Sequence, residues 1–318
     1  MSEPLAGRKV LVTGGTGFIG RYVTRVLAAA GADITVVHTP HSNDRTDVPA
    51  AVVEAVLGED DTVYRAVEGV DAVVHLAARS GGIQMQQADH AGLFVDNLRI
   101  TRQVFDAAFR ANVGAVYAAS SAVVYASAQP RPMTEDAPKI EPGHPGATGY
   151  AWGKLTDEAI ARWYSARIGR VVIGRFANVY GPGATFDPER STVVHSLVKK
   201  AVDAAPGGTL CVWGSGDAIR SFIHVRDAAR AVVTILERGE NGGVYNIDSG
   251  DPVSIRQLAE TIRDIVDPSL DVRFDPSKPA GPPFRVLDTT ALRGLGFEPR
   301  TALTDGLGET VEAYRSLP

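Results

Sequence analysis

The sequence has 318 residues, of which 44% are hydrophobic and 22% are charged, and its formal net charge is −5. A chain of this length and composition is a globular protein with room for one large core and a smaller second one. The acidic balance and the lack of a lysine–arginine run exclude a surface built mainly for nucleic acid or for anionic membranes.

The start of the sequence and its cysteine content favour a cytoplasmic protein. Residues 1–9 lack the apolar core of a signal peptide. No apolar run approaches the roughly 18 residues that a membrane span requires. The single cysteine, Cys211, cannot form an internal disulfide, which fits a reducing compartment. We expect a cytoplasmic location, no membrane or nucleic-acid partner, and no bound metal.

The first half of the sequence alternates short apolar runs with helical patterns. We predict strands at residues 10–12, 34–37, 72–76, 115–118 and 171–176, and helices at about 17–30 and 95–111. This alternation implies right-handed crossovers and a parallel sheet that is covered on both faces. The predicted fold class is α/β, a Rossmann-type doubly wound parallel sheet with a smaller α+β lobe.

The later sequence supplies the second lobe. Proline and glycine become frequent, and we predict helices at 192–204, 225–236 and 254–266 and strands at 210–213 and 244–247. We expect the following division: a dinucleotide-binding domain over 1–178, with 219–246 returning to it, and a substrate lobe over 179–218 and 247–318. Ligands of open parallel sheets bind outside the carboxyl ends of the strands, so we expect the site between the lobes.

A glycine-rich turn follows the first strand. Gly14 allows a tight turn, Gly17 lets the backbone approach a pyrophosphate, and Gly20 lets the next helix pack on the strand. The free N–H groups of that helix start, around Phe18 and Ile19, would bind the phosphates. A turn without a ligand is the alternative, and the strand–turn–helix context disfavours it.

The spacing Gly-x-x-Gly-x-x-Gly resembles the extended short-chain dehydrogenase/reductase family, also known as the NAD-dependent epimerase/dehydratase family. NAD-preferring members usually carry an acid at the end of the second strand, where this sequence has His38, followed by His41 and Arg45. A partly protonated imidazole near an arginine would tolerate a 2′-phosphate. We expect NADP in preference to NAD. The alternative is that His38 is a solvated loop residue and that the backbone holds the ribose.

Tyr150 and Lys154 are four residues apart, which places them on one face of a helix. A free tyrosine is a poor acid–base catalyst at neutral pH, and a nearby ammonium together with an oxidised nicotinamide would lower its pKa. Lys154 would also bind the nicotinamide ribose. A tyrosine and lysine at this spacing are common by chance, and the pair gains weight from its position after the serine-containing strand.

The family resemblance assigns further residues to the site. Ser121 matches the serine that hydrogen-bonds the reacting sugar oxygen, whereas Ser120 is an alternative that usually forms a turn. Asn97 matches the asparagine that starts the helix near the cofactor, and a plain helix cap explains it equally well. Three more positions are expected to contact ligands: Ala77 and Ala78 the cofactor, and Ser80 the substrate.

Two later signatures imply a nucleotide-diphosphate sugar as substrate. In segment 175–182, Asn178 matches a family asparagine that contacts the diphosphate. Arg220 and Arg285 match family arginines that bind phosphate, and the alternative for them is a surface ion pair. Trp213 either stacks on a nucleobase or is a buried aromatic of the second lobe.

Loops of this sequence, 80–83 and 183–190, look like those of GDP-fucose synthase and GDP-mannose 3,5-epimerase. Those enzymes invert carbons with a cysteine and a lysine or histidine, where this sequence has Val123 and Thr192. Epimerisation at carbons 3 and 5 is therefore disfavoured. Dehydration is also disfavoured, because Ala122 and Val123 stand where 4,6-dehydratases have Asp-Glu.

Two reactions remain that need only hydride transfer at one carbon, with Tyr150 as proton relay. We expect an NADPH-dependent 4-ketoreductase of a nucleotide-linked 4-keto-6-deoxy sugar. The alternative is a 4-epimerase with tightly bound NAD, and a non-catalytic nucleotide-binding protein is a third hypothesis, disfavoured because Tyr150 and Lys154 are both present. Family members often dimerise through two helices beside the active site, so we expect a homodimer.

Overall fold

The structure is a computed structural model that describes most of the chain: residues 5–40, 47–59, 61–80, 86, 88–126, 131–142, 144, 148–188, 190–278 and 281–317. His41 and Arg45, which were expected near the adenosine ribose, lie outside the described residues. Parts of the two loops that resemble GDP-fucose synthase, residues 81–83 and 189, also lie outside them.

A parallel sheet is the centre of the first lobe. Within the described residues it has seven strands in the order β11-β6-β5-β4-β1-β2-β3. The strands are β1 (Lys9–Thr13), β2 (Asp33–His38), β3 (Ala51–Glu54), β4 (Ala72–His75), β5 (Ala115–Ser121), β6 (Arg170–Phe176) and β11 (Val244–Ile247). All six neighbouring pairs are parallel, as the alternating pattern predicted.

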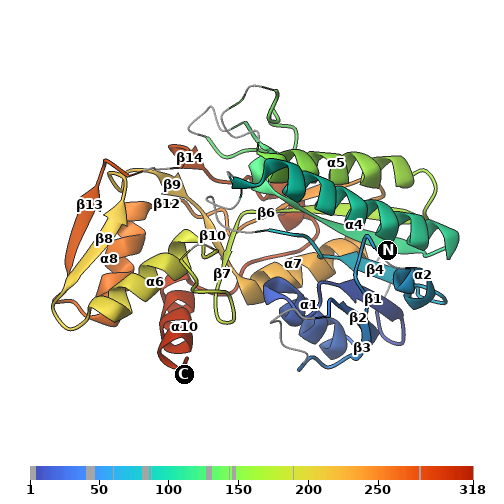
Figure 1. Cartoon of the computed structure of the whole chain (residues 1–318), viewed down its shortest axis with the longest axis horizontal. Coiled ribbons are helices and arrows are strands. Elements are labelled where there is room, and N and C mark those ends of the chain that lie inside the picture. Colours follow the sequence, from blue (N-terminus) through green and yellow to red (C-terminus); the bar gives the residue numbers. More distant parts are fainter. Residues whose placement is uncertain are drawn as a thin grey trace.

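Helices cover both faces of this sheet (Figure 1). One layer contains α1 (Phe18–Ala29) and α7 (Val225–Arg238), and the other contains α2 (Thr62–Ala66), α4 (His90–Arg110) and α5 (Gly149–Tyr164). The side chains of β1 show why both layers are needed. Val10 and Val12 belong to the core under α1 and α7, whereas Leu11 belongs to the core under α4 and α5. The fold is therefore the Rossmann-type α/β fold that the sequence predicted.

The second lobe has its own core, formed mainly by α6 (Val193–Ala204), α8 (Ile255–Val266) and α10 (Leu303–Arg315). In the part of the chain that the structure describes, three small sheets accompany these helices: β7 with β10, β9 with β12 and β14, and β8 with β13. Their bounds are β7 (Asn178–Tyr180), β8 (Thr209–Trp213), β9 (Ile219–Arg220), β10 (Phe222–His224), β12 (Val253–Ser254), β13 (Asp271–Asp275) and β14 (Phe284–Arg285).

The chain crosses between the two lobes more than once. After α6 and β8 it returns through α7 and β11, and β11 extends the large sheet beside β6. Helix α9 (Thr290–Gly294) brings it back again, because Leu292 and Phe297 pack in the first core. The predicted substrate lobe over 247–318 thus contains residues that pack with the dinucleotide-binding lobe.

Two local features differ from the predicted elements. Helix α4 begins at His90 and not near residue 95, because the Asp89 carboxylate accepts a hydrogen bond of 2.9 Å from the backbone N–H of Gly92. Strand β3 was not predicted, since it lies at the sheet edge and most of its side chains are exposed. Among the described helices, none is both long enough and apolar enough to cross a bilayer.

Candidate active site

The turn after β1 has no room for side chains at two of its glycines. Gly14 has a φ of +70°, and a Cβ there would lie 2.8 Å from the backbone nitrogen of Ala77. A Cβ at Gly20 would lie 2.0 Å from the carbonyl oxygen of Gly14. The turn, the start of α1 and the end of β4 are therefore packed backbone to backbone, as the glycine spacing predicted.

The start of α1 is open to an anion. Gly17 occupies the N-cap and offers no side-chain hydrogen bond, so the N–H groups of Phe18 and Ile19 lack partners within the helix. Arg21, which the sequence analysis did not single out, places its Nε 3.4 Å from the carbonyl oxygen of Gly17. A cation and the positive end of a helix dipole at one turn fit the pyrophosphate of a dinucleotide.

His38, at the end of β2, packs against this turn. Its side chain is buried, and Nδ1 lies 3.2 Å from Oγ1 of Thr16. The alternative that His38 is a solvated loop residue is therefore wrong. Thr16 and the glycine turn hold the imidazole at the strand end, where the family resemblance implies the adenosine ribose.

Asn97 lies inside α4, which begins at His90, so the expectation that it starts or caps this helix is wrong. Its Oδ1 accepts a hydrogen bond of 2.7 Å from the N–H of Arg79, and its Nδ2 donates to the carbonyl oxygens of Arg79 and Leu93. These bonds fix the segment after β4, where Ala77 and Ala78 are half-buried and Ser80 is exposed. Asn97 thus shapes the expected cofactor surface through the backbone.

The structure brings Tyr150, Lys154 and Ser121 together. Helix α5 is capped by Thr148, whose Oγ1 accepts from the N–H of Ala151 at 3.2 Å, so Tyr150 stands in the first turn. Its phenol lies close enough to Ser121, at the carboxyl end of β5, for that hydroxyl to lower its pKa. The Nζ of Lys154 lies 6.0 Å from the centre of the Tyr150 ring. These are the three residues predicted to be catalytic.

Burial controls the pKa of this tyrosine. Burial raises the pKa of the Tyr150 phenol, and the opposing influences of Lys154 and the Ser121 hydrogen bond do not reverse the shift. The prediction that Lys154 lowers this pKa has the correct sign for its own contribution, but the net direction is upward. Burial would lower the pKa of Lys154, yet Asp157 and Tyr150 raise it overall, so the ammonium stays charged.

Asp157 is a member of this site that the sequence analysis missed. Its Oδ2 lies 3.0 Å from Nζ of Lys154, and the two side chains are only 4% and 5% exposed. The three-residue spacing on a helix was the available signal, although most carboxylates at such spacing are solvated.

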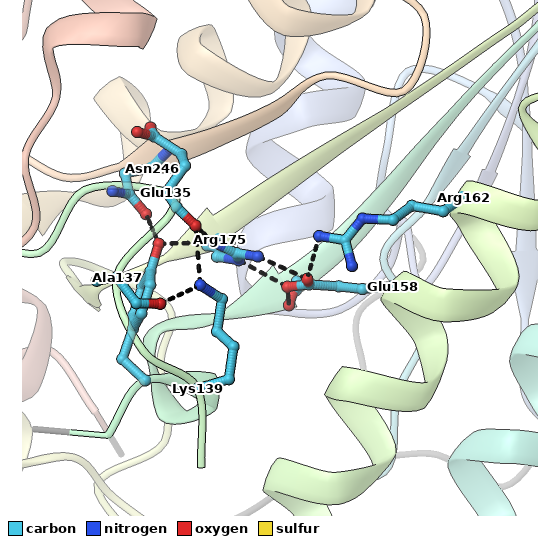
Figure 2. A network of polar contacts seen from close by, with 9 residues as sticks. Glu135, Ala137, Lys139, Glu158, Arg162, Arg175 and Asn246 are labelled. Carbon is cyan, nitrogen blue, oxygen red and sulfur yellow. Dashed lines mark hydrogen bonds and ion pairs between the residues drawn. The ribbon is translucent and has the colours of Figure 1, made fainter. Parts of the chain in front are cut away.

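A second buried network joins α5 to the sheet (Figure 2). Arg175 donates from Nε and Nη2 to the two carboxylate oxygens of Glu158, each at 2.7 Å. Ser120 donates to the same carboxylate at 2.6 Å, and Tyr125 accepts from Nη1 of Arg175 at 2.8 Å. Ser120 therefore has a structural role, which leaves Ser121 as the hydroxyl that faces Tyr150.

Two arginines predicted to bind phosphate lie side by side in the second lobe. Arg220 on β9 and Arg285 on β14 are directly paired in a parallel register. Burial and then the neighbouring Arg285 lower the pKa of Arg220 to about 10, and burial lowers that of Arg285. Neither forms an ion pair with a described residue, and Nε of Arg285 has no hydrogen-bond partner among them. Two adjacent cations without a counter-charge suit a diphosphate.

Asn178 links the two groups of residues. It follows the carboxyl end of β6, and its Nδ2 donates to the carbonyl oxygen of Ser221 at 2.9 Å, next to Arg220.

Trp213 is 46% exposed with Nζ of Lys200 5.2 Å above its ring, so the alternative of a buried aromatic is wrong.

The positions compared with the 3,5-epimerising enzymes carry no acid or base. Thr192 caps α6, and its Oγ1 lies 2.9 Å from Nδ1 of His195. His195 itself is buried, its Nε2 lies 3.1 Å from the carbonyl oxygen of Gly181, and burial lowers its pKa to about 4. Among the described residues, no cluster of three or more histidine, cysteine or acidic side chains could hold a metal ion.

The site combines a glycine-rich turn, a helix whose first N–H groups have no partner in the helix, and a tyrosine, a lysine and a serine. This combination defines the class of dinucleotide-dependent oxidoreductases. The model of the NAD dependent epimerase/dehydratase family matches residues 10–248. The chain belongs to this family, and it is an NAD(P)-dependent enzyme.

Comparison with individual proteins gives the same family. The chain is 35% identical over 310 residues to a putative GDP-L-fucose synthase 2 of Oryza sativa subsp. japonica, with 96% of this chain and 86% of the relative covered. It is 33% identical over 321 residues to a dTDP-4-dehydro-6-deoxy-D-allose reductase of Streptomyces bikiniensis, with 98% and 97% covered. The crystal structure of a UDP-glucose 4-epimerase from Thermotoga maritima has a TM-score of 0.86 at 24% identity, covering 96% and 98%, and shows the shared fold.

Proposed function

We propose that the chain is an NADPH-dependent 4-ketoreductase of a nucleotide-linked 4-keto-6-deoxy sugar. The observation that carries this proposal is the grouping of Tyr150 and Ser121 beside the charged Lys154. Relatives named as a dTDP-4-dehydro-6-deoxy-D-allose reductase and as GDP-L-fucose synthases support it. A protonated tyrosine is the form that a reductase needs, because it donates a proton to the oxygen of the ketone.

Each group of residues has a role in this proposal. Arg220 and Arg285 bind the diphosphate and thereby orient the sugar. Ser121 donates a hydrogen bond to the keto oxygen, and Tyr150 gives that oxygen its proton. Lys154 keeps its positive charge beside the phenolate that remains. A bound nicotinamide cofactor would supply the hydride, with its pyrophosphate at the glycine turn and its nicotinamide ribose at Lys154.

The relatives named GDP-L-fucose synthase raise the question of whether this chain also inverts carbons 3 and 5. The side chains at the corresponding positions, Val123 and Thr192, cannot take a proton from carbon. His195 does not replace them, because both of its ring nitrogens contact protein atoms in a buried position. We therefore propose reduction at carbon 4 without inversion at carbons 3 and 5.

A direct assay tests the proposal. The purified chain is incubated with NADPH and a panel of dTDP- and GDP-linked 4-keto-6-deoxyhexoses, and we expect the absorbance of the reduced nicotinamide to fall. Tyr150→Phe should lose turnover by about 100-fold or more while it still binds NADPH. No consumption of NADPH with any sugar would contradict the proposal. Interconversion of two nucleotide sugars without added cofactor, by protein that already carries NAD, would instead support the 4-epimerase.

NADPH is proposed as the preferred cofactor because of His38. Its imidazole stands at the end of β2, and no acidic side chain occupies that position. The contact with Thr16 holds the imidazole at this position, where a side chain without negative charge tolerates a 2′-phosphate.

We also propose that the enzyme is a cytoplasmic homodimer formed through α4 and α5. Trp163 on α5 is 72% exposed and Val95 on α4 is 38% exposed, so this helical layer presents apolar surface to solvent. Sedimentation velocity tests the oligomeric state, and a monomer at micromolar concentration would contradict it.

A further inference from the structure

The buried pair of Lys154 and Asp157 is not required by the proposed chemistry. The lysine alone would bind a ribose and stabilise a phenolate. A carboxylate taken out of water is unfavourable unless it is paired, and here it is paired with the lysine of the active site, at 3.0 Å. Burial of the Asp157 carboxylate is energetically unfavourable, and the carboxylate contacts Lys154 beside the expected proton donor. These two facts point to a role in proton transfer.

A line of hydrogen-bonded side chains leads from the glycine turn towards Asp157, whose Oδ1 has no hydrogen-bond partner among the described residues. Thr101 on α4 faces the carboxylate, and its Oγ1 lies 3.2 Å from Nε2 of His75. On the other side of that ring, Nδ1 lies 2.7 Å from Oγ1 of Thr13, which accepts from the N–H of Ala77 at 3.3 Å. The line therefore runs from the strand before the glycine turn to Thr101, near the carboxylate that pairs with Lys154.

Asp157 also determines the direction of the lysine. An ammonium has three N–H donors. One donates to the carbonyl oxygen of Ala119 in β5 at 3.0 Å and one to Asp157, which leaves one for a ribose hydroxyl of the cofactor. The carboxylate thus fixes Lys154 in place and brings a negative charge near the phenol.

We propose that Asp157 is a positioning residue that holds the ammonium of Lys154 at 3.0 Å and places a negative charge near the phenol of Tyr150, so that the phenol remains protonated further into the alkaline range than it would beside the lysine alone. This inference rests on the proposed function, since it explains why a reductase would balance the lysine with a carboxylate.

The charges around Tyr150 support this assignment. On its own helix, Lys154 lowers the pKa of the phenol and Asp157 raises it. Glu158, the next acid of α5, is paired with Arg175 from β6. From β4, His75 contributes no charge at neutral pH, because burial and then Lys154 lower its pKa to about 3. Strand β5 contributes the uncharged hydroxyl of Ser121. Asp157 is therefore the side chain that offsets Lys154.

A titration of the phenol tests the proposal without any substrate. The chain has nine tyrosines, so Tyr150 is isolated as the difference in ultraviolet tyrosinate absorbance between a protein and its Tyr150→Phe counterpart. The wild type and Asp157→Asn are each measured against such a counterpart. We expect Asp157→Asn to lower the midpoint of Tyr150 by about one pH unit, since one nearby negative charge is removed. An unchanged or higher midpoint in a folded variant would overturn the proposal.

Two further variants separate positioning from a structural role. Asp157→Glu keeps the charge and should restore the wild-type midpoint, even where its stability is reduced. Thr156→Ala, at the neighbouring position, should leave the midpoint unchanged. A loss of stability in both Asp157 variants, with no shift in either midpoint, would mean that Asp157 is only structural. Circular dichroism and NADPH binding confirm folding in every variant.

Activity gives a second readout that fails separately. In reduction assays, the loss of kcat at alkaline pH should begin about one pH unit lower in Asp157→Asn than in the wild type. If the wild type reduces no 4-keto sugar, the proposed function fails, but the titration still decides the role of Asp157. If the wild type is active and its alkaline limb does not move in the variant, the proposal about Asp157 fails alone.

Discussion

Arg175 on β6 and Glu158 on α5 meet through two hydrogen bonds of 2.7 Å, and both side chains are almost completely excluded from solvent. This pair fixes α5 on the sheet at the end of β6 (Figure 2). Tyr150 and Lys154 lie earlier on the same helix, so the pair sets where the active-site tyrosine stands relative to the carboxyl ends of the strands. The ion pair of Arg175 and Glu158 positions the helix and takes no part in the proposed reaction.

Replacing Arg175 by methionine should destabilise the protein strongly. Glu158 would keep only the partly exposed Arg162 and Ser120 as partners. A buried charge that loses its main partner costs about 3–5 kcal/mol in the free energy of unfolding. Urea unfolding followed by circular dichroism measures this loss. The matched control is Arg162→Met, which removes an arginine from the same carboxylate at the surface and should cost less than about 1 kcal/mol. Equal losses in the two variants would contradict the assigned role.

Gly20 and Gly153 both lie in helices but differ in the space that an added Cβ would find. Gly20→Ala should abolish NADPH binding and lower Tm, because its Cβ would lie 2.0 Å from a carbonyl oxygen of the phosphate-binding turn. Gly153→Ala should be tolerated and should raise the free energy of unfolding by about 0.5–1 kcal/mol. The atom nearest to the added Cβ lies 3.7 Å away, and glycine is unfavourable inside a helix. Fluorescence titration with NADPH and thermal unfolding measure both effects. Normal cofactor binding by Gly20→Ala would show that the turn is not the dinucleotide site.

The position at the end of β2 should decide between the two nicotinamide cofactors. His38→Asp places a carboxylate where the 2′-phosphate of NADP is expected, and repulsion should lower kcat/KM for NADPH relative to NADH at least about tenfold. His38→Asn is the control, because it removes the imidazole without adding charge. An unchanged cofactor ratio in His38→Asp would place the 2′-phosphate elsewhere.

The buried histidines should make stability depend on pH. Burial lowers the pKa of His195 to about 4, from 6.5 in an exposed state. Below pH 6.5 the unfolded chain therefore binds a proton that the folded chain does not, so stability falls as the pH drops from about 6.5 towards about 4. For His195 the expected loss between pH 7 and pH 5 is about 2 kcal/mol. Urea unfolding at both pH values measures it, and His195→Gln should show a smaller difference between them. An equal difference in variant and wild type would contradict the assignment.

The sequence was sufficient for features that depend on local patterns. The glycine turn, the apolar strands and the tyrosine–lysine spacing are each encoded within a few residues, and the structure brings the tyrosine, lysine and serine together as predicted. Features that depend on distant partners were not predictable. The burial of Asp157 depends on how α5 packs in the folded protein, and the contacts of Asn97 depend on a backbone segment that precedes α4. The cap at Asp89 was missed because the residues around it carry no apolar period.

The late arrival of β11 in the chain has a consequence for protein synthesis. A ribosome that has made residues up to Tyr180 has produced every strand of the large sheet except β11, so one side of β6 has no neighbour to bond. Helix α7, which covers β5 and β6 on the face of the sheet that it shares with α1, has not been made either. Nascent chains that end before Ile247 therefore expose an unpaired strand edge and apolar surface. Both features favour chaperone binding and aggregation. A stop codon in this interval would yield a fragment that contains the glycine turn and Tyr150 but lacks the strand that completes the sheet.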